Sequence, residues 1–77
     1  METIDYISAY CRMYRIDTLK MTLVTMCELT DTNIKTLSAF EHGRSKNIDH
    51  FMKYLEVSSP TQKLAFLKGV GELVGAE

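Results

Sequence analysis

The chain has 77 residues, of which 45% are hydrophobic and 25% charged, with one proline and four glycines. These values predict one compact domain over residues 1–77 and exclude a disordered, collagen-like or proline-rich chain. The formal net charge of −1 counts against a nucleic-acid binder, since such proteins usually have an excess of positive charge. No apolar run has the roughly 18 residues that a membrane-spanning helix needs, so no membrane partner is expected. No basic segment precedes an apolar stretch near residue 1, so we expect a cytoplasmic protein without a secretory signal.

Cysteine and histidine are too few to form a disulfide framework or a metal centre. Cys11 and Cys27 are expected to stay reduced in a chain without an export signal. A structural zinc site needs four closely spaced ligands, and the remote His42 and His50 do not complete one. A catalytic pocket would compete with the small core for the same side chains. We therefore expect no metal, no cofactor and no enzymatic activity.

Apolar residues recur at three- and four-residue steps along the chain, which predicts an all-α fold of five helices. The first helix is predicted over residues 4–16. Its apolar stripe consists of Ile4, Ile7, Cys11 and Tyr14. The second helix is predicted over residues 22–30, with the hydroxyl of Thr22 capping its first turn.

Two further helices follow after short polar connections. The third is predicted over residues 33–43 and stops at Gly43, because glycine readily takes the left-handed conformation after a helix end. The fourth is predicted over residues 47–55, behind a cap from Asn47 or Ser45. Its buried side is expected to consist of Ile48, Phe51, Met52 and Leu55.

The fifth helix is predicted over residues 60–74. Ser59 and Gln62 have the form of a capping box around a proline in the first helical position. Gly69 and Gly71 are expected to weaken its second half or to allow close packing against another chain. Its apolar stripe exceeds what a four-helix domain needs to cover itself, so we expect a homodimer through this helix. The expected interface residues are Leu64, Leu67, Val70 and Leu73.

Charge is distributed unevenly along the chain. Residues 33–53 have a balance of +2, whereas residues 1–32 have −2 and residues 54–77 have −1. An anion-binding surface is therefore expected in the middle segment. The alternative is a basic face that only water covers.

The stretch from Thr22 to Gly43 contains two short predicted helices joined by a tight turn. In a helix-turn-helix the second helix enters the DNA major groove while the first crosses the backbone. The stretch resembles the Cro/CI-type (XRE, lambda-repressor-like) helix-turn-helix family, with similarity from about residue 4 to residue 57. The clearest similarity lies in the segment Leu37-Ser38-Ala39-Phe40-Glu41-His42-Gly43-Arg44.

The resemblance implies a lambda-repressor-like domain that binds double-stranded DNA as a dimer and regulates transcription, as in a phage- or plasmid-type repressor switch. The residues that it places against the bases are Asn33, Ile34, Lys35, Thr36, Ser38 and Ala39. The residues that it places against the DNA backbone are Thr22, His42, Arg44, Lys46 and Asn47. Asn33 is suited to adenine, and Lys35 to guanine or a phosphate. The backbone contacts position the protein without specifying sequence.

The chain departs from the family pattern at two positions. Asp31 stands where the family's turn usually has glycine, and aspartate adopts a left-handed or Asx-turn backbone at some cost. Leu23 stands where the family tends to have a glutamine that reaches a phosphate. The second departure removes one expected DNA contact.

Glu41 has a structural role by the same resemblance. The equivalent acid in the family is one partner of a buried ion pair with an arginine of the first helix. Arg15, or else Arg12, is the candidate partner in this chain.

A second function from another class remains open at this stage. The apolar Ile34 and Ala39 on the expected DNA-facing surface, together with the missing glutamine, also fit a protein-binding module. Such a module would keep the helix-turn-helix shape and act by docking on another regulatory protein, as an anti-repressor or co-regulator does.

Overall fold

The computed structural model describes residues 3–75, and every regular element in this range is a helix. The elements in chain order are α1 (Thr3–Tyr14), the π-helix η1 (Arg15–Leu19), α2 (Leu23–Thr30), α3 (Ile34–Glu41), the 3₁₀-helix η2 (Ile48–His50), α4 (Phe51–Glu56) and α5 (Pro60–Gly75). The prediction of an all-α, five-helix fold is confirmed. The Cα radius of gyration is 11.6 Å, close to the value of about 11.5 Å for a compact domain of this length.

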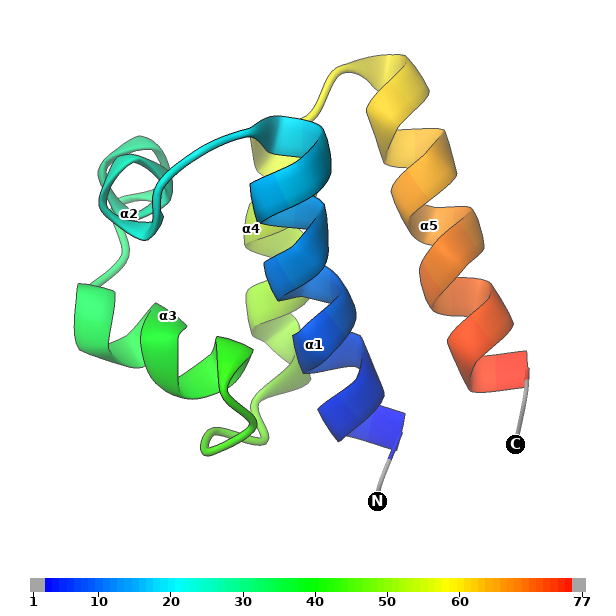
Figure 1. The fold of residues 1–77 in the computed structure, drawn as a ribbon, viewed down its shortest axis with the longest axis horizontal. Coiled ribbons are helices and arrows are strands. Elements are labelled where there is room, and N and C mark those ends of the chain that lie inside the picture. Colours follow the sequence, from blue (N-terminus) through cyan, green and yellow to red (C-terminus); the bar gives the residue numbers. More distant parts are fainter. Residues whose placement is uncertain (1–2, 76–77) are drawn as a thin grey trace.

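The other helices lie around α1 (Figure 1). α5 runs antiparallel to α1 on one side, α4 lies behind α1, and α2 and α3 lie on the opposite side from α5. Among the described residues, the buried apolar side chains are Ile7, Cys11, Tyr14, Met26, Cys27, Leu37, Phe40, Tyr54 and Phe66. Within residues 3–75, none of the helices combines the length and the apolar character needed to cross a bilayer.

The first helix runs further than predicted because its last turns widen into η1. The sequence pattern ended this helix at residue 16, whereas η1 continues to Leu19. Lys20 then takes a left-handed conformation with φ of 53°, and its N–H donates to the carbonyl of Arg15. The N–H of Met21 donates to the same oxygen at 3.1 Å. The wide turns therefore end in two hydrogen bonds to one acceptor, and Arg15 is buried.

Local hydrogen bonds define both ends of the connection between α2 and α3. Thr22 caps α2 as predicted, because its Oγ1 accepts from the N–H of Thr25 at 3.1 Å. Asp31 has φ of 51°, the left-handed conformation expected of it, and its N–H donates to the carbonyl of Cys27. Asn33 is the N-cap of α3, where its Oδ1 accepts from the N–H of Lys35 at 2.8 Å. A short, hydrogen-bonded turn thus fixes how α3 leaves α2.

The fourth helix is rotated relative to the sequence prediction. Its first turn is the 3₁₀-helix η2, and Asn47 caps it by accepting from the N–H of Asp49 at 3.1 Å. Phe51 and Leu55 of the predicted buried side pack against the core, whereas Ile48 and Met52, which were also predicted to be buried, are exposed. Tyr54 is fully buried instead. The prediction was wrong here because the apolar spacing treats a tyrosine as a boundary residue, whereas this tyrosine has a buried hydrogen-bond partner.

The fifth helix begins with the predicted capping box. The N–H of Ser59 donates to Oε1 of Gln62 at 2.8 Å, and the N–H of Gln62 donates to Oγ of Ser59 at 3.2 Å. Gly69 allows α5 to approach α1, because a Cβ there would lie 2.1 Å from Oη of Tyr10. The close packing expected between two chains thus occurs at Gly69 within one chain. A Cβ at Gly71 would meet nothing within 4 Å.

Candidate nucleic-acid interface

α3 is buried along one side of its later turn and exposed at its start. Leu37 and Phe40 are fully buried, and Glu41 is also buried on the same face. The cap and the first turn of the helix are exposed all round, at Asn33, Ile34, Lys35 and Thr36. Ser38 and Ala39 lie further along α3 and were also predicted to contact bases, but they are half-buried and so less accessible than the residues of the first turn. The exposed start of α3 therefore includes four of the six predicted base-contacting residues.

α2 and α3 follow one another through a short turn and lie at a steep angle to each other. Figure 1 shows α2 end-on while α3 runs across the page, so the two axes cross steeply. Both helices lie on the side of α1 away from α5, and neither is covered by another element in that view. The first turn of α3 is thus available to a large ligand such as a duplex.

A buried ion pair holds α3 against the helices behind it. Glu41 is bound by Arg15, with Nε donating to Oε2 and Nη2 donating to Oε1, both at 2.9 Å. Tyr54 donates from Oη to Oε2 of Glu41 at 2.8 Å. Arg15 also donates from Nη1 to the carbonyl of Met21 at 2.9 Å. The structure therefore selects Arg15 over Arg12 as the partner of Glu41.

This network connects three elements through one carboxylate. Glu41 closes α3, Arg15 opens η1 and Tyr54 lies in α4. A two-pronged guanidinium–carboxylate contact has a fixed geometry, so it sets direction as well as distance. Burial and the adjacent Glu41 charge raise the pKa of Tyr54 far above its ordinary value, so its hydroxyl keeps the proton that it donates. The orientation of α3 is thus defined by polar contacts at its C-terminal end.

Three of the predicted backbone-contacting residues are engaged in local hydrogen bonds. Thr22 caps α2 and Asn47 caps η2 through their side-chain oxygens. His42 Nδ1 lies 2.8 Å from the carbonyl of Ser38, to which it donates. All three side chains are exposed, but their positions are already fixed by the chain itself.

The two charged members of that set differ from each other. Lys46 forms an ion pair with Asp5 of α1, so part of its charge is neutralised within the chain. Arg44 is exposed and makes no ion pair with another residue of the described range. Lys35 on α3 has the same status. Lys35 and Arg44 are therefore the strongest candidates for binding an anion.

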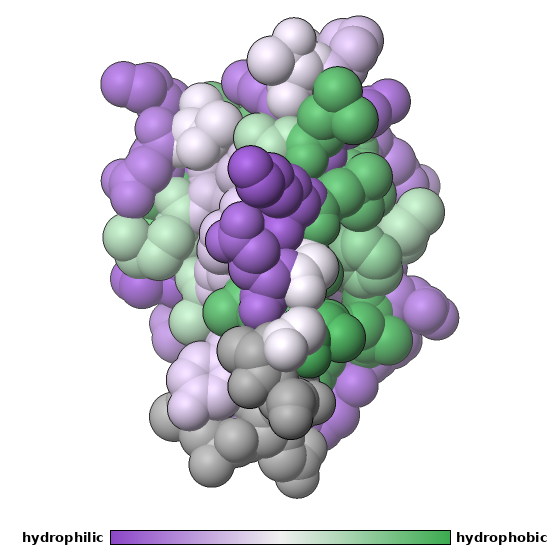
Figure 2. All heavy atoms as spheres, turned by 90° about the vertical axis from the view of Figure 1, so that its right-hand side faces the viewer, coloured by the Kyte–Doolittle hydropathy of each residue, from purple (hydrophilic) through white to green (hydrophobic). Residues whose placement is uncertain are grey.

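The predicted dimer residues on α5 divide into two pairs. Leu64 and Leu67 are 73% and 47% exposed. Val70 and Leu73 are half-buried and pack against the core of their own chain. In Figure 2, apolar side chains gather along one flank of the face that contains α5, and polar side chains cover the other flank. Only the first pair is thus fully free for a second chain.

The described residues offer no metal centre, since no three histidine, cysteine or acidic side chains among them are grouped for one. Cys11 and Cys27 are buried free thiols, and burial raises the pKa of both. They act as small apolar core residues, which is the ordinary role of buried cysteine.

Sequence reasoning missed two polar contacts of this region. Tyr54 was not expected to join the pair of Arg15 and Glu41, although a buried tyrosine usually needs a hydrogen-bond partner. The pair of Asp5 and Lys46 joins residues 41 positions apart, and no local pattern indicates it.

Comparison of the chain with protein-family models, with curated proteins and with solved structures finds no match. The geometry of α2, α3 and their supporting network is therefore the basis on which a function is assigned.

Proposed function

We propose that the protein is a small DNA-binding transcriptional regulator of the Cro/CI type, acting in the cytoplasm as a dimeric repressor. In this proposal α3 enters the major groove and α2 crosses the backbone. The observation that carries it is the exposed first turn of α3, which bears Asn33, Lys35 and Thr36 while the buried contacts of Glu41 fix the other end of the helix. A rigid, polar helix start of this kind suits base readout.

The hydrogen-bonding groups on this face define which base edges they fit. Asn33 uses Oδ1 as the cap of α3, so its amide N–H groups are the ones left to donate to a base acceptor. Lys35 lies two residues further along the chain and is a donor for guanine or for a phosphate. Ile34 is 45% exposed and suits a thymine methyl group.

Few positive charges support this face, so binding should be modest in strength and moderate in salt dependence. Lys35 and Arg44 are free of ion pairs with other described residues, whereas Lys46 shares its charge with Asp5. Two to three phosphate contacts for each subunit correspond to a slope of roughly −2 to −3 for the logarithm of affinity against that of salt.

The test is duplex binding measured by fluorescence anisotropy over a salt series, after selection of a preferred site from a random-sequence duplex pool. Lys35→Ala and Arg44→Ala should each weaken binding about tenfold and reduce the salt slope by about 1. Lys63→Ala, which removes an exposed charge on α5, is the matched control and should change little. Absence of binding at low salt, or an equal loss in all three variants, would remove the proposal.

The proposed dimer uses the exposed flank of α5. Leu64 and Leu67 are the residues available for it, since Val70 and Leu73 already contact the core of their own chain. Replacing Leu64 and Leu67 by lysine should give a monomer in sedimentation at concentrations where the parent chain is a dimer. A dimer that survives this double substitution would assign the interface to another surface.

A protein-binding module is the second candidate, and exposed apolar side chains near the same face favour it. Leu29 at the end of α2 is 60% exposed, and Val24 and Ile34 are also exposed. If selection yields no preferred duplex while Leu29→Lys abolishes capture of a defined regulator protein, the module replaces the DNA-binding proposal.

A further inference from the structure

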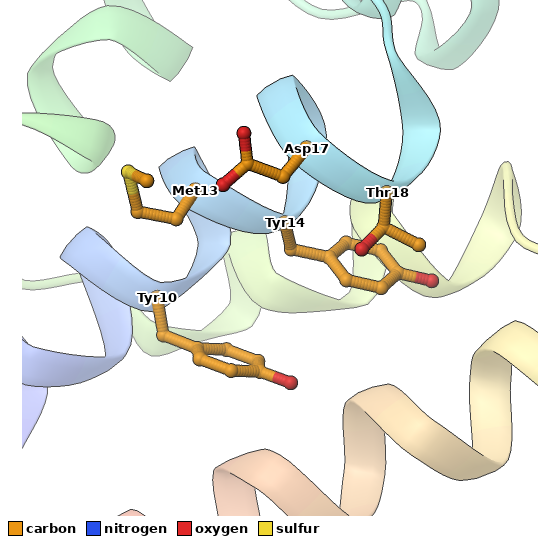
Figure 3. Close-up of a pocket in the computed structure, with 5 residues that line it drawn as sticks. All are labelled: Tyr10, Met13, Tyr14, Asp17 and Thr18. Carbon is orange, nitrogen blue, oxygen red and sulfur yellow. The ribbon is translucent and has the colours of Figure 1, made fainter.

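A shallow hollow of about 190 Å³ lies where α1 passes into η1, and nothing in the proposed DNA-binding surface uses it. Its lining residues are Tyr10, Met13, Tyr14, Asp17 and Thr18. Figure 3 shows the two tyrosine rings projecting from α1 toward α5, with Met13 and Asp17 on the opposite rim. Drug-sized ligands fill cavities of about 300–1,000 Å³, so this hollow accommodates a single side chain and not a larger molecule.

The aromatic wall of the hollow is rigid. The rings of Tyr10 and Tyr14 are nearly parallel, with 6.4 Å between centroids and 20° between planes. Tyr14 is fixed by hydrogen bonds from its hydroxyl group, which lies 2.6 Å from Oγ of Ser58 and 3.3 Å from the carbonyl of Gln62. Tyr10 lies against Gly69 of α5. Tyr14 is only 6% exposed, so the partly buried ring of Tyr10 is the one that a ligand in the hollow can reach.

The electrostatic character of the hollow is negative. Asp17 lines it, is exposed, and makes no ion pair with another residue between 3 and 75. The lining contains no basic side chain that would offset this carboxylate. The faces of aromatic rings also attract cations. An anion such as a DNA phosphate is therefore disfavoured here, and a cation is favoured.

We propose that this hollow binds one guanidinium group, namely the arginine side chain of a partner protein. A guanidinium is planar, so it stacks on a tyrosine ring while its N–H groups donate to the carboxylate of Asp17. A lysine ammonium lacks the planar surface, and a purely apolar side chain would leave Asp17 without a partner. All of the lining residues belong to α1 and η1, whereas the proposed base-contacting residues belong to α3 and its cap, so an arginine and a duplex can be bound together.

This inference is independent of DNA binding and is tested without DNA. The probe is N-acetyl-arginine amide, titrated into the isotope-labelled full chain and followed by two-dimensional amide NMR. N-acetyl-citrulline amide, which has nearly the same shape and no charge, is the matched ligand control. Saturable shifts centred on residues 10–18 are expected with the arginine compound, with affinity about five- to tenfold weaker for citrulline.

Two substitutions locate the cation. Asp17→Asn should weaken binding about two- to fivefold, whereas Asp49→Asn, which removes the same charge from exposed η2, should leave it unchanged. Tyr10→Leu retains an apolar side chain but removes the aromatic ring, and should also weaken binding; an unchanged amide NMR pattern outside residues 10–18 and the adjoining part of α5 confirms that the fold is intact.

Three results would overturn the proposal. The first is equal binding of the arginine and citrulline compounds, and the second is equal loss in the two aspartate variants. The third is a shift of residues 10–18 with protein concentration alone, which would assign the hollow to an arginine of a second copy of the chain.

Discussion

The helices on the two sides of α1 are held in place by different kinds of interaction. On the side of α2 and α3, a bidentate ion pair between Arg15 and Glu41 and a set of helix caps determine the arrangement. On the side of α5, aromatic rings do so: Phe66 packs against Tyr14 with centroids 4.6 Å apart and nearly parallel to Phe51 at 6.3 Å. The contacts on the side of α2 and α3 are directional and tolerate little change in helix orientation. Those on the side of α5 are spread over a broad area of ring surface.

This difference suits the functions proposed for the two sides. A helix that recognises bases must keep its orientation within narrow limits, and a charge-assisted network defines orientation better than apolar packing does. The packing of α5 against α1 depends on buried apolar area, so one ring contact there can replace another. The two sides should therefore respond differently to substitution.

The largest effect is expected at the ion pair. Glu41→Ala leaves the buried guanidinium of Arg15 and the hydroxyl of Tyr54 without their acceptor, and should lower the free energy of unfolding by about 3–5 kcal/mol. Urea unfolding followed by circular dichroism measures it. Glu56→Ala, which removes an exposed side chain at the end of α4, is the control and should change the free energy of unfolding by less than about 0.5 kcal/mol. Equal effects in the two variants would show that the network does not hold α3.

A smaller effect is expected where α5 meets α1. Gly69→Ala places a methyl group 2.1 Å from Oη and 2.5 Å from Cζ of Tyr10, so the ring must move away. The cost of overpacking exceeds the gain in helix propensity, and a net loss of about 1–2 kcal/mol is expected.

Gly71→Ala is the matched substitution on the same helix. It meets no atom within 4 Å and should stabilise the chain by about 1 kcal/mol, the propensity difference alone. Thermal unfolding midpoints that move in opposite directions for the two variants would confirm the close approach at Gly69. Midpoints that rise together would contradict it.

Alkaline pH tests the core between the two sides. Burial, with a contribution from the Glu41 charge, raises the pKa of Cys11 above its ordinary value of 9.0. Above pH 9 the unfolded chain loses this proton while the folded chain keeps it, so the free energy of unfolding falls as pH rises. The expected slope is about 1.4 kcal/mol per pH unit for each such group. Cys11→Ala should remove its share of the slope in urea unfolding, and an unchanged slope would assign the effect elsewhere.

Local patterns in the sequence predicted the fold and the helix caps. They did not predict the polar contacts between residues far apart in the sequence. The hydroxyl of Thr22 and the pair of Ser59 and Gln62 act within one helical turn, so spacing alone identifies them. The rotation of α4 was predicted wrongly because it depends on the hydroxyl of Tyr54 reaching a carboxylate 13 residues away. The ion pair of Lys46 with Asp5 was not predicted for the same reason, since the two residues are far apart in the sequence.

The smallest effect is expected at the turn between α2 and α3. Asp31 has φ of 51°, a conformation that costs a residue with a Cβ more than it costs glycine. Asp31→Gly should therefore raise the free energy of unfolding by about 0.5–1 kcal/mol, after the entropy that glycine loses on folding is subtracted. Because Asp31 is an exposed acid close to α3, the same change should also strengthen duplex binding slightly. Asp31→Asn separates the two effects, since asparagine removes the charge and keeps the Cβ: it should strengthen binding without the full gain in stability. A loss of stability in Asp31→Gly would mean that the aspartate side chain itself holds the turn.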